Sequence, residues 1–146
     1  MTRPSEAGSD EVSILLIEDN PADVFLVEEA MKTEDISYRL THAADGERAI
    51  SLLRQLEDDK SLPCPSLLLL DLNLPRKSGD EVLERFRASE RCKNVPVIIL
   101  TSSDSATDRE KARRLGANAY FRKPSDLDEF LRLGAVIKQV LADTAK

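Results

Sequence analysis

The sequence predicts an α/β fold, in which a five-stranded, doubly wound parallel sheet carries helices on both faces. Apolar runs without polar alternation, at residues 12–17 and 66–70, are typical of strands that are buried on both faces of a sheet. Segments with helical apolar spacing alternate with the predicted strands along the whole chain, which favours parallel strands joined by crossover helices. A length of 146 residues is suited to one domain.

The first half of the chain contains two predicted strands and two predicted helices. The strand at 12–17 is almost wholly apolar, and Asn20 then caps a helix over residues 21–32. Residues 36–42 alternate between apolar and polar side chains, so we expect a half-covered strand at an edge of the sheet. The next helix covers residues 47–57, where apolar side chains recur at helical spacing.

The second half starts with the strand at 66–70. Pro75 has no N–H to donate, so it stops the ladder of hydrogen bonds from continuing beyond this strand. Pro96 lies near the start of a later strand, where its missing N–H does least harm, and Gly116 is the expected C-terminal breaker of a helix. Ser125 is the expected cap of the last helix. The predicted elements of this half are, in order, helix 78–89, strand 95–101, helix 105–115, strand 117–121 and helix 126–142.

Composition and charge oppose several classes of function. The net charge of −6 has the wrong sign for binding a nucleic-acid backbone, and no apolar run is long enough to span a bilayer. The first residues are small and polar, without the apolar core of a signal peptide. We therefore expect a cytoplasmic protein with a disordered tail over residues 1–11 and one folded domain over residues 12–146.

The chain has two cysteines, Cys64 and Cys92, without the spacing of a metal site. We expect both to be free thiols, because the cytosol keeps thiols reduced.

Side chains with functional chemistry follow four of the five predicted strands. Right-handed crossovers and the edge character of residues 36–42 favour the strand order 2-1-3-4-5, the order of flavodoxin-like sheets. The carboxyl ends of parallel strands lie at one edge of the sheet, which is where ligands bind in such folds. The residues that the order brings to this edge are Glu18, Asp19, Asp71, Thr101 and Lys123.

Crowded carboxylates repel one another, and a bound cation relieves that repulsion. Oxygen ligands beside open solvent suit Mg²⁺, so the predicted cofactor is magnesium, held by Glu18, Asp19 and Asp71 with the backbone carbonyl of Asn73. This arrangement permits phosphoryl transfer onto a carboxylate, because the ion and Lys123 neutralise charge on the phosphoryl oxygens.

The set Glu18-Asp19, Asp71, Thr101 and Lys123-Pro124 resembles the receiver domain of bacterial two-component response regulators. The resemblance covers residues 12 to about 142. It implies that Asp71 accepts the phosphoryl group from a sensor histidine kinase, with Thr101 and Lys123 as the other catalytic residues. It implies a switch in protein–protein contacts and no turnover enzyme beyond self-phosphorylation and slow autodephosphorylation.

The resemblance also assigns two further features to the chain. Tyr120 matches the aromatic switch residue, which moves together with Thr101 after phosphorylation, and the Lys123–Pro124 peptide bond is usually cis in the family. The runs at 20–23 and 71–79 look most like stand-alone regulators that serve phytochrome-type and hybrid kinases. We expect no DNA-binding unit and no effector domain.

Apolar residues on the predicted last helix occupy a wider arc than one surface helix needs, which indicates a homodimer or partner contact. One stripe is expected to face the sheet: Leu127, Phe130, Leu131, Gly134, Ile137 and Leu141. The second stripe lies beside it: Leu133, Val136 and Val140.

Three other classes share parts of this pattern. A flavin-binding domain has the same sheet order, but the acidic turn at residues 18–21 would repel a phosphate. A phosphatase with an aspartyl nucleophile needs an acid two residues after Asp71, where Asn73 stands. A pseudo-receiver that only binds partners would not need the acidic pair and Lys123.

Overall fold

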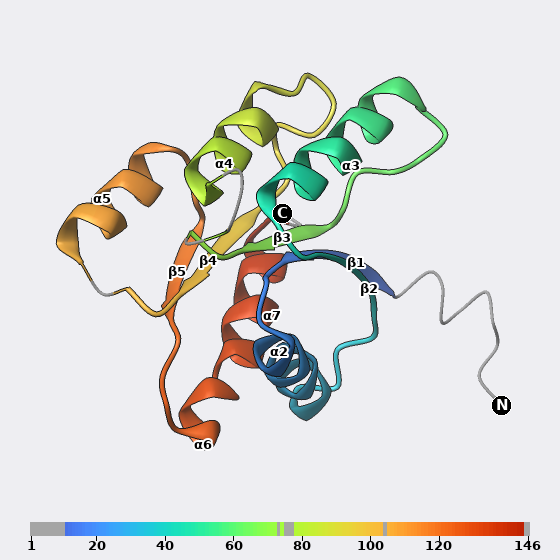
Figure 1. Cartoon of the computed structure of the whole chain (residues 1–146). Coiled ribbons are helices and arrows are strands. Elements are labelled where there is room, and N and C mark those ends of the chain that lie inside the picture. Colours follow the sequence, from blue (N-terminus) through green and yellow to red (C-terminus); the bar gives the residue numbers. More distant parts are fainter. Residues whose placement is uncertain (1–10, 73, 75–77, 104, 145–146) are drawn as a thin grey trace, which may run out of the picture.

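The computed structural model describes residues 11–72, 74, 78–103 and 105–144. Five strands, all parallel, form one sheet in the order β2-β1-β3-β4-β5, which confirms the predicted fold class (Figure 1). The register pairs Ile17 of β1 with Leu70 of β3, so both strands end together. The strands are β1 (Val12–Ile17), β2 (Tyr38–Ala43), β3 (Leu67–Leu70), β4 (Val97–Thr101) and β5 (Ala119–Arg122).

Helices cover both faces of the sheet. Asn20, Asp45, Ser78 and Ser105 each cap the start of a helix through a side-chain oxygen that accepts a backbone N–H. The helices are α2 (Pro21–Thr33), α3 (Gly46–Asp58), α4 (Gly79–Ala88), α5 (Ala106–Arg114), α6 (Leu127–Phe130) and α7 (Leu133–Thr144). None of them, within the described ranges, has the length and apolar character that a bilayer span requires.

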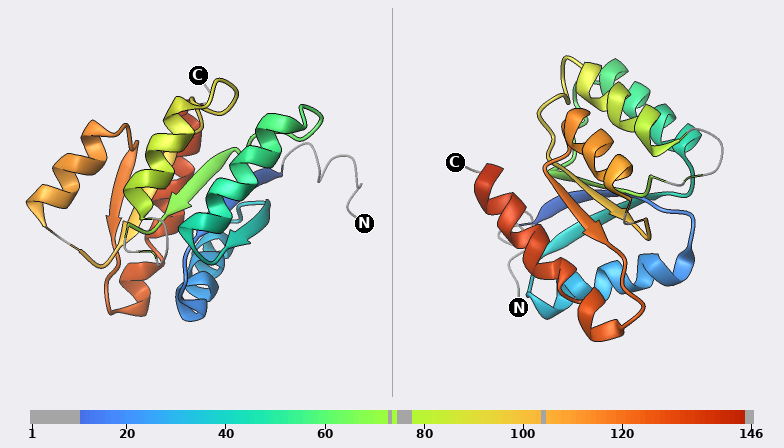
Figure 2. Two further views of the ribbon diagram at one scale, coloured as in Figure 1. Left: turned by 45° about the horizontal axis from the view of Figure 1, so that its top comes forward. Right: turned by 90° about the vertical axis from the view of Figure 1, so that its left-hand side faces the viewer.

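The sheet separates two apolar cores. Helices α3, α4 and α5 lie on one face and α2, α6 and α7 on the other (Figures 1 and 2). Alternate residues of β1 serve the two sides: Leu15 and Ile17 pack toward α3 and α4, and Ile14 and Leu16 pack toward α2 and α7. The apolar strands are therefore buried on both faces, as their lack of alternation predicts.

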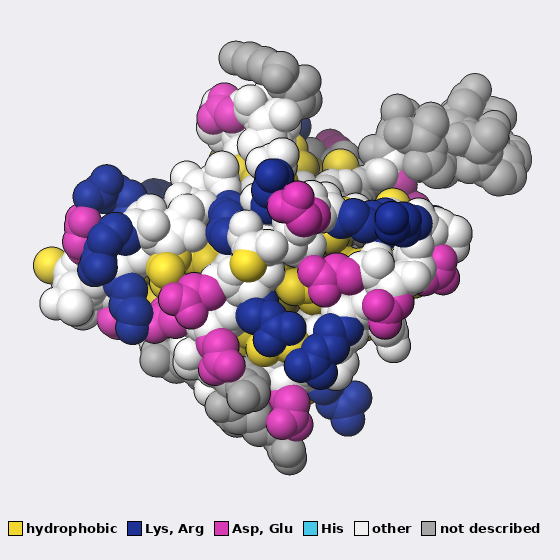
Figure 3. Space-filling view, turned by 90° about the horizontal axis from the view of Figure 1, so that it is seen from above, with side chains coloured by type: hydrophobic (Ala, Val, Ile, Leu, Met, Phe, Trp, Pro, Cys, Tyr) yellow, Lys and Arg dark blue, Asp and Glu magenta, His cyan; other side chains and the backbone are white. Residues whose placement is uncertain are grey.

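The outer surface over α3, α4 and α5 carries charges of both signs (Figure 3). Lys111 of α5 pairs with Asp80 of α4, and Arg113 lies 2.7 Å from Glu110 on its own helix. The basic side chains on this face are therefore interspersed with acidic ones and do not form a continuous basic patch.

The prediction of one last helix over residues 126–142 is wrong. The segment forms two helices, and the first is capped by the side chain of Asp126 instead of Ser125. Leu127 is 54% exposed, whereas Leu133 and Val140 of the expected second stripe are buried in the core. The break after α6 rotates α7, so that its apolar arc packs mostly against α2 and the sheet.

The prediction of free thiols is also wrong, because Cys64 and Cys92 form a disulfide. Sequence spacing gave no sign of it, since 28 positions separate the two residues. The fold brings them together: Cys64 lies shortly before β3 and Cys92 shortly before β4, and these strands are neighbours in the sheet.

Candidate functional site

Backbone hydrogen bonds at the ends of the strands fix the residues of the predicted site. The N–H of Glu18 donates to Ala43 O at 3.0 Å, and the N–H of Asp71 donates to Ile17 O at 3.1 Å. The N–H of Lys123 donates to Thr101 O at 2.7 Å. The sheet thus delivers these side chains to one edge, around an open cleft that is lined by Glu18, Asp19, Asn20, Asp23, Asp71, Ser102, Lys123, Pro124 and Ser125.

Three carboxylates of this cleft form a compact acidic cluster. Ligand oxygens of Glu18, Asp19 and Asp71 all lie within 4.8 Å of one another. Glu18 is fully buried and Asp71 is 6% exposed, whereas Asp19 faces solvent. Because buried like charges repel strongly, the cluster needs positive charge nearby.

Lys123 supplies that charge by contacting three carboxylates at once. Its Nζ lies 2.7 Å from Glu18 Oε1, 2.8 Å from Asp23 Oδ2 and 3.1 Å from Asp71 Oδ2. Burial by itself would lower the pKa of Lys123, but the contacts with Asp23 and Glu18 and the charge of Asp71 outweigh it and raise the pKa well above its usual range. The side chain therefore remains a cation at any physiological pH.

The pKa of Glu18 is also raised, but for a carboxyl this shift favours the neutral form. Burial raises the pKa of its carboxyl to about 7, although Lys123 pulls in the other direction and the charge of Asp71 adds to the rise. The N–H of Asn20 donates to Glu18 Oε2 at 3.1 Å, which stabilises the ionised form only in part. A pKa in this range means that Glu18 can take up a proton near neutral pH when no cation is bound beside it.

The donor set of the cluster fits a hard divalent cation. Oxygen ligands, one solvent-facing carboxylate and an open cleft match an ion that keeps several waters. Glu18 adds a buried carboxyl to this donor set, and its ionised form would be stabilised by a cation in the cleft. Asn73, the remaining predicted ligand, lies outside the described residues.

The predicted switch residues lie on β4 and β5, outside the lining of the cleft. Thr101 ends β4 and is fully buried, and its hydroxyl oxygen accepts the N–H of Ser103 at 3.3 Å. The half-buried Tyr120 of β5 donates its hydroxyl hydrogen to Ser103 O at 3.0 Å. The guanidinium of Arg109 lies 4.4 Å from the centre of the Tyr120 ring. In this structure Ser102, and not Thr101, lines the cleft.

Two findings differ from the expectations for this site. The Lys123–Pro124 bond is trans, since the described residues contain no cis peptide bond. An X–Pro bond prefers trans by only about 0.5–1 kcal/mol, and Lys123 reaches the acidic cluster with the bond in trans. The site predicted from the sequence did not include Asp23, whose carboxylate is one of the three partners of Lys123.

A signal for Asp23 does exist in the sequence. Asn20 caps α2, so Asp23 lies in the first turn of a helix that starts beside the acidic pair. Gly79 was a second omission: a Cβ at this position would lie 2.5 Å from Asp71 O and 2.6 Å from Leu72 Cα. A glycine there lets the start of α4 approach the backbone of Asp71 closely.

Comparison with known proteins agrees with this geometry. The profile of the response regulator receiver domain matches residues 14–133. The chain belongs to the response regulator receiver family. It is 37% identical over 131 residues to the response regulator Rcp1 of Synechocystis sp. (strain PCC 6803), a match that covers 90% of this chain and 89% of Rcp1.

Solved structures support the same assignment of the receiver domain. The Mn²⁺-bound form of Rcp1 superposes with a TM-score of 0.77, at 37% identity, over 88% of this chain and 92% of that one. The phosphorylated cyanobacterial phytochrome response regulator RcpA gives 0.81, at 32% identity, over 93% and 97%. The receiver domain of a Pseudomonas aeruginosa sensor histidine kinase, with magnesium in its active-site cleft, gives 0.70 at 30% identity, over 90% and 98%.

These matches establish the class of protein to which the domain belongs. It is a domain of two-component signalling, homologous to phytochrome response regulators, and it carries an acidic cluster of the kind that fits a divalent metal.

Proposed function

We propose that this receiver domain accepts a phosphoryl group on Asp71 from a phosphohistidine of a sensor histidine kinase. One observation carries the proposal: Asp71 Oδ2 lies 3.1 Å from the buried ammonium of Lys123, inside the acidic cluster. A carboxylate oxygen of Asp71 attacks phosphorus, the P–N bond breaks, and its electron pair remains on the donor imidazole.

The residues around Asp71 are suited to separate parts of this transfer. Glu18, Asp19 and Asp71 would hold Mg²⁺, with the backbone carbonyl of Asn73 as a further ligand. When bound, the ion supplies positive charge to the phosphoryl oxygens and relieves the repulsion among the carboxylates. Lys123 shifts from Asp71 toward a phosphoryl oxygen, and the hydroxyl of Thr101 donates to another.

The switch follows from that rearrangement. Thr101 must turn toward the phosphoryl group, which breaks its contact with the N–H of Ser103. Tyr120 donates to the carbonyl of the same residue, so the movement of this loop releases the Tyr120 hydroxyl. The domain then presents a changed β4–β5 surface to its partner, and it reverts by slow autodephosphorylation.

The kinase is proposed to be of the phytochrome or hybrid type, and the site of action to be the cytoplasm. The named phytochrome regulators among the relatives support the first point. A homodimer through the last helix remains a prediction, which now depends on the half-buried Leu131, Val136 and Leu141. Sedimentation at high concentration tests it, with and without beryllofluoride; a single monomer species in both cases would contradict it.

The central test is labelling by acetyl phosphate with Mg²⁺, read as the mass increase of one phosphoryl group. We expect wild-type protein to be labelled and Asp71→Asn to remain unlabelled. Asp58→Asn, at an exposed acid at the end of α3, is the matched control and should be labelled like wild type. Labelling of Asp71→Asn at another residue would overturn the assignment.

A further inference from the structure

The Cys64–Cys92 disulfide lies at the end of the sheet opposite to the acidic cluster. It joins the segment before β3 to the segment before β4, with 5.7 Å between the two Cα atoms. These segments follow α3 and α4 and run back to the amino ends of the two central strands (Figure 2). Nothing in the proposed phosphoryl chemistry uses this bond.

The two sulfurs differ in how a reagent can reach them. Cys92 is 1% exposed and packs in the core under α3 and α4. Cys64 is half-buried and lines an open cavity of about 240 Å³ together with Glu11, Arg39 and Ser66. A thiolate from solution therefore meets the sulfur of Cys64 first.

The loop that carries Cys64 has a second set of anchors. The guanidinium of Arg91, next to Cys92, donates to the carbonyl oxygens of Leu56 and Leu62, with a longer contact of 3.3 Å to Asp59 O. The N–H of Ser66 donates to Ser13 O at 2.7 Å. No cysteine sulfur takes part in these hydrogen bonds, so we expect them to maintain the fold when the disulfide is broken.

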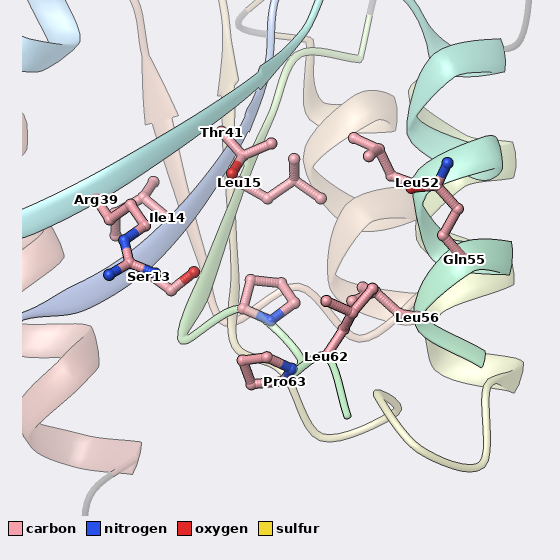
Figure 4. A pocket seen from close by; sticks show the side chains of 11 residues that line it. Ser13, Ile14, Leu15, Arg39, Thr41, Leu52, Gln55, Leu56, Leu62 and Pro63 are labelled. Carbon is pink, nitrogen blue, oxygen red and sulfur yellow. The ribbon is translucent and has the colours of Figure 1, made fainter. Parts of the chain in front are cut away.

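The same loop forms one wall of an apolar cavity of about 210 Å³ (Figure 4). Leu62 and Pro63 of the loop lie across the cavity from Leu15 of β1, and Leu52 and Leu56 of α3 contribute a further side. Pro65 also lines the cavity. Cys64 stands between the two prolines in the sequence and lines the neighbouring cavity of about 240 Å³. Loss of the disulfide would release the part of the wall at residues 63–65, between the anchors at Leu62 and Ser66, and would change access to the apolar lining.

We propose that Cys64 and Cys92 form a reversible thiol–disulfide modification site that controls the loop at 59–66. Accessibility of one sulfur, burial of the other and the independent anchors of the loop support reversibility in the folded protein. Disulfides that form in a reducing compartment are mostly of this transient, sensing kind.

The reaction is exchange with a dithiol reductant. A thiolate of the dithiol attacks the sulfur of Cys64, the protein S–S bond breaks, and Cys92 leaves as a thiolate that takes up a proton. The second thiolate of the dithiol attacks the sulfur of its own molecule in the mixed disulfide and releases Cys64 as a thiolate, which is protonated. Two electrons pass from the dithiol to the protein. A disulfide such as oxidised glutathione reverses the exchange.

The test uses the full chain, with dithiothreitol as the reductant and no denaturant. After alkylation, we expect two modified cysteines per chain, an unchanged far-ultraviolet circular dichroism spectrum, and a Tm that is about 5–15 °C lower. Amide exchange should accelerate at residues 59–66 and stay unchanged in β1. In a reduced sample that has not been alkylated, oxidised glutathione should restore the original mass and Tm.

Cys64→Ser and Cys92→Ser serve as matched variants, and each should show the lower Tm with no response to dithiothreitol. Three outcomes would overturn the proposal. The thiols could become accessible only in denaturant, which would mark a permanent structural bond. The reduced protein could fail to reoxidise with glutathione disulfide. The amide exchange of residues 59–66 could be insensitive to reduction.

Discussion

At the scale of single residues, the site depends on a balance between one cation and three carboxylates. Lys123 contacts Glu18, Asp23 and Asp71, and it is almost fully shielded from water. A buried charge of either sign is costly without its partners. Lys123 therefore holds Asp71, the proposed phosphoacceptor, in place, and in the proposed mechanism the same lysine later engages the phosphoryl group.

Removal of Lys123 should destabilise the metal-free protein. We expect Lys123→Ala to lower the free energy of unfolding at pH 8 by about 3 kcal/mol, because the buried carboxylates lose their counter-charge. Saturating Mg²⁺ should recover part of that loss, since the ion supplies positive charge at the same cluster. Urea unfolding with and without Mg²⁺ measures both effects.

Lys60→Ala, at an exposed lysine, is the control and should change stability by less than about 0.5 kcal/mol. A Lys123→Ala protein as stable as this control would show that the three contacts carry little energy. In the presence of Mg²⁺ and acetyl phosphate, Lys123→Ala should still be labelled. Phosphorylation of this variant should leave its affinity for the partner unchanged.

Glu18 makes the metal-free domain sensitive to pH. Its pKa of about 7 in the folded state lies above the ordinary value of 4.5, so the folded state binds more protons between these values. The stability contributed by this group is present below about pH 4.5 and is lost as pH rises through about 7. We expect unfolding midpoints in urea without metal to fall between pH 5.5 and pH 8.

Glu18→Gln should flatten that dependence, because the amide does not titrate. It should also weaken the response to Mg²⁺, since one buried ligand is lost. A pH slope as steep in Glu18→Gln as in wild type would assign the effect to another group.

At the scale of the elements, close backbone approaches fix the positions of helices near the site. Gly79 begins α4 beneath Asp71, and Gly134 lies on α7 against the carbonyl oxygen of Ala30 on α2. A methyl group at either position meets backbone atoms, which cannot move aside as a flexible side chain can. The two glycines differ in the segment that they contact: Gly79 approaches the backbone of Asp71 in the site, whereas Gly134 joins α7 to α2.

Paired substitutions separate stability from site geometry. We expect Gly79→Ala and Gly134→Ala each to destabilise the fold by about 1–3 kcal/mol, as overpacked cores do. Only Gly79→Ala should also slow the labelling of Asp71 by acetyl phosphate, because the clash displaces the backbone of that residue. Equal labelling rates in the two variants, measured well below their Tm values, would refute the role of Gly79.

The outcome for each element shows which signals in the sequence are reliable. Residues 12–17 were predicted with correct bounds, because a buried strand between turns leaves an unbroken apolar run. The last helix was predicted as one piece, because apolar spacing does not reveal the break between Phe130 and Leu133. Burial of Leu133 and Val140 depends on that break, so the predicted interface stripe was mostly core.

The site was predictable in part for a similar reason. Glu18, Asp19, Asp71 and Lys123 follow strands directly, so the parallel sheet alone brings them together. Asp23 projects from a helix, and the disulfide joins two loops, so both depend on how segments pack rather than on where strands end. Spacing along the chain carries no information of that kind.

At the scale of the whole molecule, metal binding should be linked to both folding and protonation. A divalent ion binds the folded cluster and not the dispersed carboxylates of the unfolded chain, so it stabilises the fold by mass action. At a free concentration of one hundred times Kd, the gain is about 2.7 kcal/mol. For a domain of this size, that gain should appear as an increase in Tm of about 5–15 °C.

The increase should be larger at pH 8 than at pH 5.5, because the ion must displace the proton that Glu18 retains at the lower pH. Thermal unfolding in Mg²⁺ and in an NaCl solution of matched ionic strength separates binding from general screening. Asp19→Asn leaves the buried residues in place but removes the solvent-facing ligand, so it should abolish most of the shift. An equal shift in NaCl, or in Asp19→Asn, would mean that the acidic cluster is not where the ion binds.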